Sequence, residues 1–139
     1  MYITSSNCGG QAYDNFVLYT ATTQIGGLVG DWSLYYHIQG QDRTRVLDAH
    51  YEQTGAQHEL TFSVPDTNPN QDAHGASVYY MAENSDRVVD YQEPTPGQNR
   101  HIVWDVVTAA GSFTAWDYNN EERACWGSNL DNVSCVPTM

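Results

Sequence analysis

The stretch ELTFSV at residues 59–64 alternates polar and apolar side chains without a break, and this alternation sets the fold class. Leu60, Phe62 and Val64 share one side of an extended chain, while the other positions carry polar or charged groups. A period of two is typical of a β-strand with one buried face, because successive side chains of a strand point to opposite faces. We therefore predict a strand here.

Comparable runs rich in β-branched and aromatic residues recur along the chain, separated by glycine, proline and asparagine turns. One of them also fits helical spacing, but its neighbours favour a strand. These runs are Phe16–Thr23, Trp32–Ile38, Arg45–Glu52 (the ambiguous run), Ser77–Met81, Arg87–Tyr91, His101–Thr108 and Ser112–Tyr118. The pattern predicts an all-β fold with little helix, an antiparallel β-sandwich or flattened barrel of about seven to eight strands. Its length fits a single domain over residues 1–139.

The charge of the chain restricts its partners. It contains no lysine, and five arginines stand against 17 Asp and Glu residues for a formal net charge of -12. A strongly anionic protein repels phosphate backbones and anionic headgroups. We therefore expect neither nucleic acid nor an anionic membrane as a partner, and we expect a monomer. A chain without amine side chains also suits a protease-rich extracellular setting.

The three cysteines favour one disulfide near the C-terminus. Cys125 and Cys135 frame a nine-residue segment rich in turn-forming residues, which would bring two thiols within bonding distance. A bridge from Cys8 to either of them, or three reduced thiols, stays open. The triplet at Asn132 in the same segment is an N-glycosylation sequon. Together these features favour a secreted, extracellular protein.

The Pro65–Gly75 loop holds the one candidate metal site that we infer from the sequence. Oxygen-bearing side chains stand at alternate positions, and calcium prefers such oxygen ligands. They are Asp66, Asn68, Asn70 and Asp72. The loop lacks the turn glycine and closing glutamate of a helix-loop-helix calcium site, so a solvated turn is the alternative. The histidines lack metal-ligand spacing, and we expect no other cofactor.

Aromatic residues are the most concentrated binding signal. The chain has ten tyrosines and four tryptophans. Rings next to Asp, Asn and Gln can stack on sugars or anchor a protein partner. We expect Trp104 and Trp116 to lie mainly in the core. The candidate binding residues at the surface are Tyr35, Tyr79, Tyr118 and Trp126.

Catalytic motifs are scarce in this sequence. It has neither a Gly-x-Ser-x-Gly elbow nor a glycine-rich phosphate loop. Carboxylates are abundant, and a pair such as Glu59 with Asp105 would suit a glycosidase if it stood about 5–10 Å apart. A binding protein is therefore favoured over an enzyme. A secreted carbohydrate-active hydrolase or a carbohydrate-binding module is the alternative.

The chain as a whole resembles the small secreted fungal effectors and elicitors that induce a hypersensitive response in plants. The resemblance rests on Cys8, the segment Cys125–Cys135, the lysine-free acidic composition and the β-rich pattern. It implies a secreted, non-enzymatic virulence protein that acts on, or is sensed by, a plant host. Its partner would be a host protein or a cell-wall glycan. No site residues carry over, and the odd cysteine departs from the paired usage of such proteins.

Overall fold

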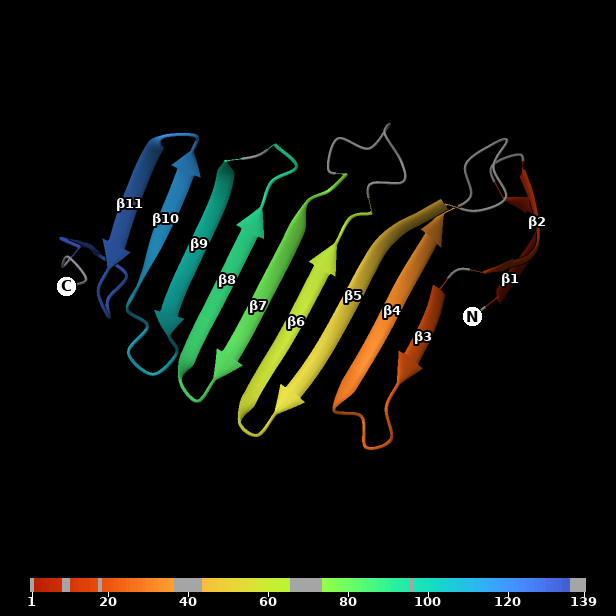
Figure 1. Ribbon diagram of the computed structural model, residues 1–139, viewed down its shortest axis with the longest axis horizontal. Coiled ribbons are helices and arrows are strands. Elements are labelled where there is room, and N and C mark those ends of the chain that lie inside the picture. Colours follow the sequence, from red (N-terminus) through yellow and green to blue (C-terminus); the bar gives the residue numbers. More distant parts are fainter. Residues whose placement is uncertain are drawn as a thin grey trace.

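Ten of the twelve described strands form one open antiparallel sheet. The computed structural model describes residues 2–8, 11–17, 19–36, 44–65, 74–95 and 97–135, and before Tyr19 we consider only the backbone. Ten strands follow one another in the sheet in sequence order, from β3 at one edge to β12 at the other (Figure 1). The first two strands pair only with each other. The sheet is thus a simple meander of neighbouring strands.

The strands are mostly seven residues long. The separate hairpin consists of β1 (Tyr2–Cys8) and β2 (Gln11–Val17). The strands of the large sheet are β3 (Tyr19–Thr23), β4 (Val29–Tyr36), β5 (Thr44–Thr54), β6 (Gln57–Ser63), β7 (Ser77–Glu83), β8 (Asp86–Gln92), β9 (Gln98–Asp105), β10 (Gly111–Asp117), β11 (Asn120–Trp126) and β12 (Asn132–Val133).

Tight turns impose this order. Two-residue loops join β5 to β6, β7 to β8 and β10 to β11, and the first loop residue has a positive φ in each: Gly55, Asn84 and Tyr118. Such turns match the twist of paired strands and place consecutive strands side by side. Glycine and asparagine adopt this conformation readily. For Tyr118, at φ 56°, the conformation is unfavourable because its β-carbon crowds the backbone.

The prediction of an all-β antiparallel fold is confirmed, but the strands form one sheet where a sandwich or barrel was expected. A sandwich needs a connection that carries the chain from one sheet to the other. Here each described strand from β4 to β11 pairs with both of its sequence neighbours, so the strands from β3 to β12 stay in one layer (Figure 1). The alternation of polar and apolar residues along a strand shows that one face of the strand is apolar. It does not show whether a second sheet covers that face.

Cross-strand pairs lie on the same face of a sheet, so the register shows which residues share a face. One row joins Trp32, Ala49, Phe62, Val78 and Tyr91 from β4 to β8. A second row on that side runs from β5 to β10. It comprises Tyr51, Leu60, Tyr80, Val89, Ile102 and Phe113. We call the side that carries these two rows the apolar face.

The sheet has almost no interior. Among the described residues the buried apolar side chains are those of Pro65 and Ala76, the latter at 5% exposure, and no large side chain is fully buried. On the apolar face Tyr19 and Leu34 are 40% and 39% exposed. No described segment is a helix long and apolar enough to cross a membrane. One layer of strands therefore leaves the apolar face in contact with solvent.

Candidate functional site

The side opposite the apolar face carries an unbroken series of polar side chains, and we call it the polar face. One row crosses eight strands from β4 to β11: Asp31, His50, Thr61, Tyr79, Asp90, His101, Thr114 and Arg123. A neighbouring row runs parallel to it: Ser33, Asp48, Ser63, Ser77, Gln92, Asn99, Trp116 and Glu121. Hydroxyls, amides, carboxylates and two kinds of aromatic ring thus share one continuous surface.

Two Asp–His pairs recur on this face. Asp31 Oδ1 lies 2.7 Å from His50 Nδ1, and Asp90 Oδ1 lies 2.5 Å from His101 Nδ1. In both cases the histidine is followed across the sheet by a threonine, Thr61 or Thr114. Four strand spacings of about 4.8 Å separate the pairs by about 19 Å. No sequence repeat revealed this arrangement, because loops of unequal length separate the strands.

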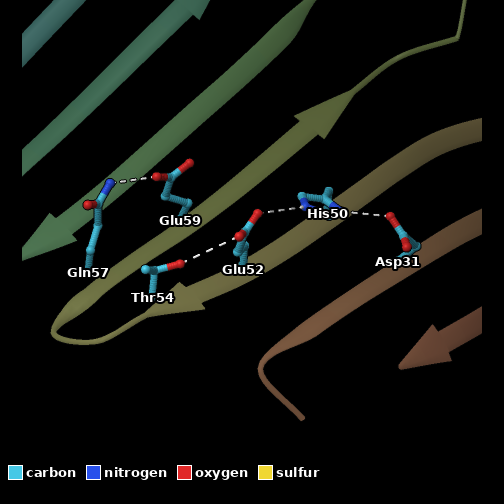
Figure 2. A network of polar contacts seen from close by, with 6 residues as sticks. All are labelled: Asp31, His50, Glu52, Thr54, Gln57 and Glu59. Atoms are coloured by element: carbon cyan, nitrogen blue, oxygen red, sulfur yellow. Dashed lines mark hydrogen bonds and ion pairs between the residues drawn. The ribbon is translucent and has the colours of Figure 1, made fainter. Parts of the chain in front are cut away.

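The first pair belongs to a network at the β4–β6 end of the sheet (Figure 2). His50 lies between Asp31 and Glu52, with its Nε2 3.8 Å from Glu52 Oε2. The hydrogen bond to Asp31 is the main reason that the pKa of His50 is raised, with a smaller contribution from Glu52. Both carboxylates favour the imidazolium form. His50 is therefore the pH-sensitive group of this network.

Glu52 stands directly opposite Glu59 in the register, and each carboxylate has a neutral donor. Thr54 Oγ1 donates to Glu52 Oε1 at 3.5 Å, and Gln57 Nε2 donates to Glu59 Oε1 at 2.5 Å (Figure 2). Glu59 also interacts with Tyr79 on the next strand, β7. Burial and the Glu59 carboxylate, to which the phenol is hydrogen-bonded, raise the pKa of Tyr79. Tyr79 therefore keeps its proton and serves as a hydrogen-bond donor.

A hollow of about 340 Å³ lies beside Tyr79, over β7 to β10. Its polar-face lining comprises Ser77, Tyr79, Asp90, Gln92, Asn99 and Trp116. The Trp116 ring is partly exposed, and its Nε1 donates to Glu121 Oε2 at 3.3 Å. Its centroid lies 6.4 Å from that of His101. The hollow combines two aromatic rings with amide, hydroxyl and carboxylate groups, as small polar ligands require.

The four aromatic residues singled out from the sequence do not form one site. Tyr79 lies in the hollow, Tyr35 is half-buried near the end of β4, and Tyr118 is 65% exposed in the β10–β11 turn. Trp126 lies on the apolar side, and its Nε1 donates to the Ala109 carbonyl at 2.7 Å. Trp116, which we expected in the core, lines the hollow instead. The register between β9 and β10 decides which face Trp116 occupies, and this register cannot be derived from the sequence.

The favoured disulfide is present in the structure. Cys125 on β11 is bonded to Cys135, with their α-carbons 5.3 Å apart. The bridge closes the segment that contains β12, which pairs with β11 through Val133 and Asn132. The Asn132 side chain is exposed, so the sequon is accessible. A covalent bond thus holds the short edge strand on the sheet.

The candidate calcium ligands Asp66, Asn68, Asn70 and Asp72 lie outside the described residues. Elsewhere in the described part of the chain no group of three or more His, Cys, Asp or Glu side chains is arranged to hold a metal.

The Glu59–Asp105 pair does not have the spacing of a glycosidase. Glu59 lies on β6 and Asp105 on β9, so three strand spacings separate them by about 14 Å. Asp105 also has a local role, because its Oδ1 accepts hydrogen bonds from the Val107 and Thr108 amides. The closer pair of carboxylates is Glu52 with Glu59.

The protein belongs to the class of open antiparallel β-meanders. The central parts of its two sides differ in polarity. No family model, curated protein or solved structure matches this chain.

Proposed function

We propose that this chain is an extracellular, non-enzymatic glycan-binding protein of the effector or elicitor kind that its sequence resembles. The hollow over β7 to β10 is the observation that carries the proposal. Aromatic faces stack on the C–H faces of sugar rings, while amides and carboxylates bind hydroxyls. Trp116 and Tyr79 provide the rings, and Asp90, Gln92 and Asn99 provide polar groups at hydrogen-bonding positions.

The charge around the hollow selects among glycans. Asp90 and Glu121 lie on the same face as Glu59, whereas Arg123 is the cation of the row. Arg100 also lines the hollow, but its guanidinium is paired with Glu93 at 3.2 Å, so the carboxylates would repel uronic acids and sulfated sugars. The ligand is therefore an uncharged hexose or N-acetylhexosamine polymer, as found in cell walls. The Cys125–Cys135 bridge and the exposed Asn132 sequon support an extracellular location.

A glycan array followed by calorimetry tests the proposal. We expect the wild-type chain to bind a neutral oligosaccharide, and Trp116→Ala to weaken that binding at least tenfold. Tyr36→Ala is the matched control, because it removes an exposed aromatic ring outside the hollow. Binding that is lost in Tyr118→Ala but kept in Trp116→Ala would move the site to the β10–β11 turn. No binding to any neutral glycan would refute the proposal.

The same samples separate binding from hydrolysis. Incubation of the bound glycan with wild-type protein is expected to release no new reducing ends. The Glu52–Glu59 pair is a candidate for acid–base chemistry on this face, as is the directly opposed pair Asp86–Asp105. Release of reducing ends that disappears in Glu52→Gln or Glu59→Gln would establish a hydrolase instead.

A further inference from the structure

The centre of the apolar face is uncharged. Its two rows contain only aliphatic, alanine and aromatic side chains from β5 to β8. A hollow of about 500 Å³ opens on it at the β3–β6 end, lined by Tyr19, Trp32, Leu34, Leu47, Ala49, Leu60 and Phe62. Exposed apolar patches of more than a few hundred Å² mark interaction surfaces in soluble proteins. This face therefore has the chemistry of an interface.

The size of the face matches an interface of two folded chains. Eight strands from β4 to β11 at about 4.8 Å spacing, each about 20 Å long, cover a flat area of about 700 Å². Two such faces together give about 1,400 Å² before side-chain relief is counted, and stable complexes bury about 1,200–2,000 Å². The face is thus large enough for a specific complex without help from the strand edges.

The accessible surface of the chain is larger than that of a compact monomer of the same mass. The chain exposes 9535 Å², whereas a compact monomer of 15.6 kDa exposes about 7,250 Å². The surplus is about 2,300 Å² per chain. An open single-layer sheet, which exposes both of its faces, accounts for part of this surplus.

We propose that a second copy of this chain covers the apolar face, so that two sheets pack face to face as a β-sandwich. The described strands of one chain form one layer, and a sandwich needs two. A second copy brings an identical apolar face, and a two-fold axis makes that face complementary to itself. The charged groups of the polar face then point outward on both sides. The two highly anionic chains therefore meet through the uncharged β5–β8 centre of this face, while Arg87, Arg100 and Glu122 lie on the same face toward β8 to β11.

This assembly differs from the monomer expected from the sequence, and it is independent of the glycan site on the polar face. Sedimentation velocity over a range of concentrations tests it. The wild-type chain is expected at twice 15.6 kDa. Phe62→Asp places a charge at the centre of the apolar face and is expected to give the monomer mass. Thr61→Asp is the matched control, because it adds the same charge one residue away on the polar face; it is expected to stay dimeric.

Further measurements cover the case in which Phe62→Asp does not fold. Leu34→Glu changes a residue that is 39% exposed, so it disturbs the single chain less, and it is expected to weaken the dimer at least tenfold. The melting temperature of the wild type is expected to rise with protein concentration, since dissociation accompanies unfolding. A wild-type chain that sediments as a monomer at all concentrations overturns the proposal. So does a dimer of unchanged affinity in a folded Phe62→Asp or Leu34→Glu variant.

Discussion

The indole of Trp126 lies directly against the α-carbon of Gly111, in the space that a side chain at position 111 would fill. The two residues face each other across β10 and β11. The close approach lets Trp126 Nε1 reach the Ala109 carbonyl, at 2.7 Å. A glycine at this point of the strand therefore allows the tryptophan of the neighbouring strand to approach the backbone of β10.

Gly111→Ala is expected to lower the free energy of unfolding by about 1–3 kcal/mol, because the new methyl group overpacks against the indole and the backbone. Chemical denaturation followed by circular dichroism measures this loss. In the Trp126→Leu background the same substitution should cost less, since part of the clash is gone. Strictly additive losses in the double variant would contradict the packing described.

Reduction of the Cys125–Cys135 bond is expected to destabilise the protein by about 3 kcal/mol, because the closed loop spans about ten residues. Thermal melts with and without reductant, and of Cys135→Ser, measure the loss. Cys8→Ser is the control for removing a thiol from the chain. Melts that superimpose in the presence and absence of reductant would count against a stabilising bridge.

His50 is expected to titrate above its ordinary pKa of about 6.5, because Asp31 stabilises the imidazolium. A pKa raised in the folded state contributes stability that is present below about pH 6.5 and is lost as the pH rises through the folded value. Proton NMR of the imidazole checks the pKa directly. Asp31→Asn should move it back towards 6.5, and Glu52→Gln should move it less. An equal effect of the two substitutions would be inconsistent with this geometry.

Asp105 is expected to titrate at about 2, because it accepts hydrogen bonds from Ser85 and from the Val107 and Thr108 region of the β9–β10 loop. A depressed pKa contributes stability above the unfolded value of about 3.9, and this contribution is lost as the pH falls through about 2. Asp105→Asn should therefore lower the melting temperature at pH 7 but not near pH 2. Glu122→Gln, which removes an exposed carboxylate, is the control. A difference in melting temperature between the wild type and Asp105→Asn that persists unchanged at pH 2 would refute the lowered pKa of Asp105.

Tyr118→Asn is expected to stabilise the β10–β11 hairpin by about 0.5–1 kcal/mol, because asparagine tolerates the left-handed conformation that tyrosine adopts there. Denaturant midpoints at constant slope measure the gain. Tyr36→Asn, in an extended strand, should give no such gain. A loss in Tyr118→Asn would mean that ring contacts outweigh the backbone cost.

Local rules in the sequence predicted much of the fold. Alternation at Leu60 and Phe62 predicted β6, and the turn signals at Gly55 and Asn84 predicted hairpins that the structure contains. The strands at Tyr2–Cys8 and Asn120–Trp126 were missed. The second has a Glu-Glu-Arg run that is polar on both faces, and only its pairing with β10 makes it extended. The spacing of the last two cysteines predicted their bridge.

The candidate site depended on relationships between strands. The sequence indicated Tyr79 as a binding residue but assigned Trp116 to the core. Cross-strand register places both on one face, although 37 positions separate them in the chain. The pairing of His50 with Asp31, and of His101 with Asp90, arises in the same way. A shift of one residue in register would move each side chain to the opposite face.

The sequence by itself determined that the chain forms antiparallel strands with one apolar side, because side-chain alternation and turn chemistry are local properties. The tertiary structure alone decided that the strands remain in one layer and which residues of different strands share a face. Those features depend on non-local pairing, in which residues meet only after the chain has folded. The apolar side, which alternation predicted to be buried, is consequently left open by a single chain.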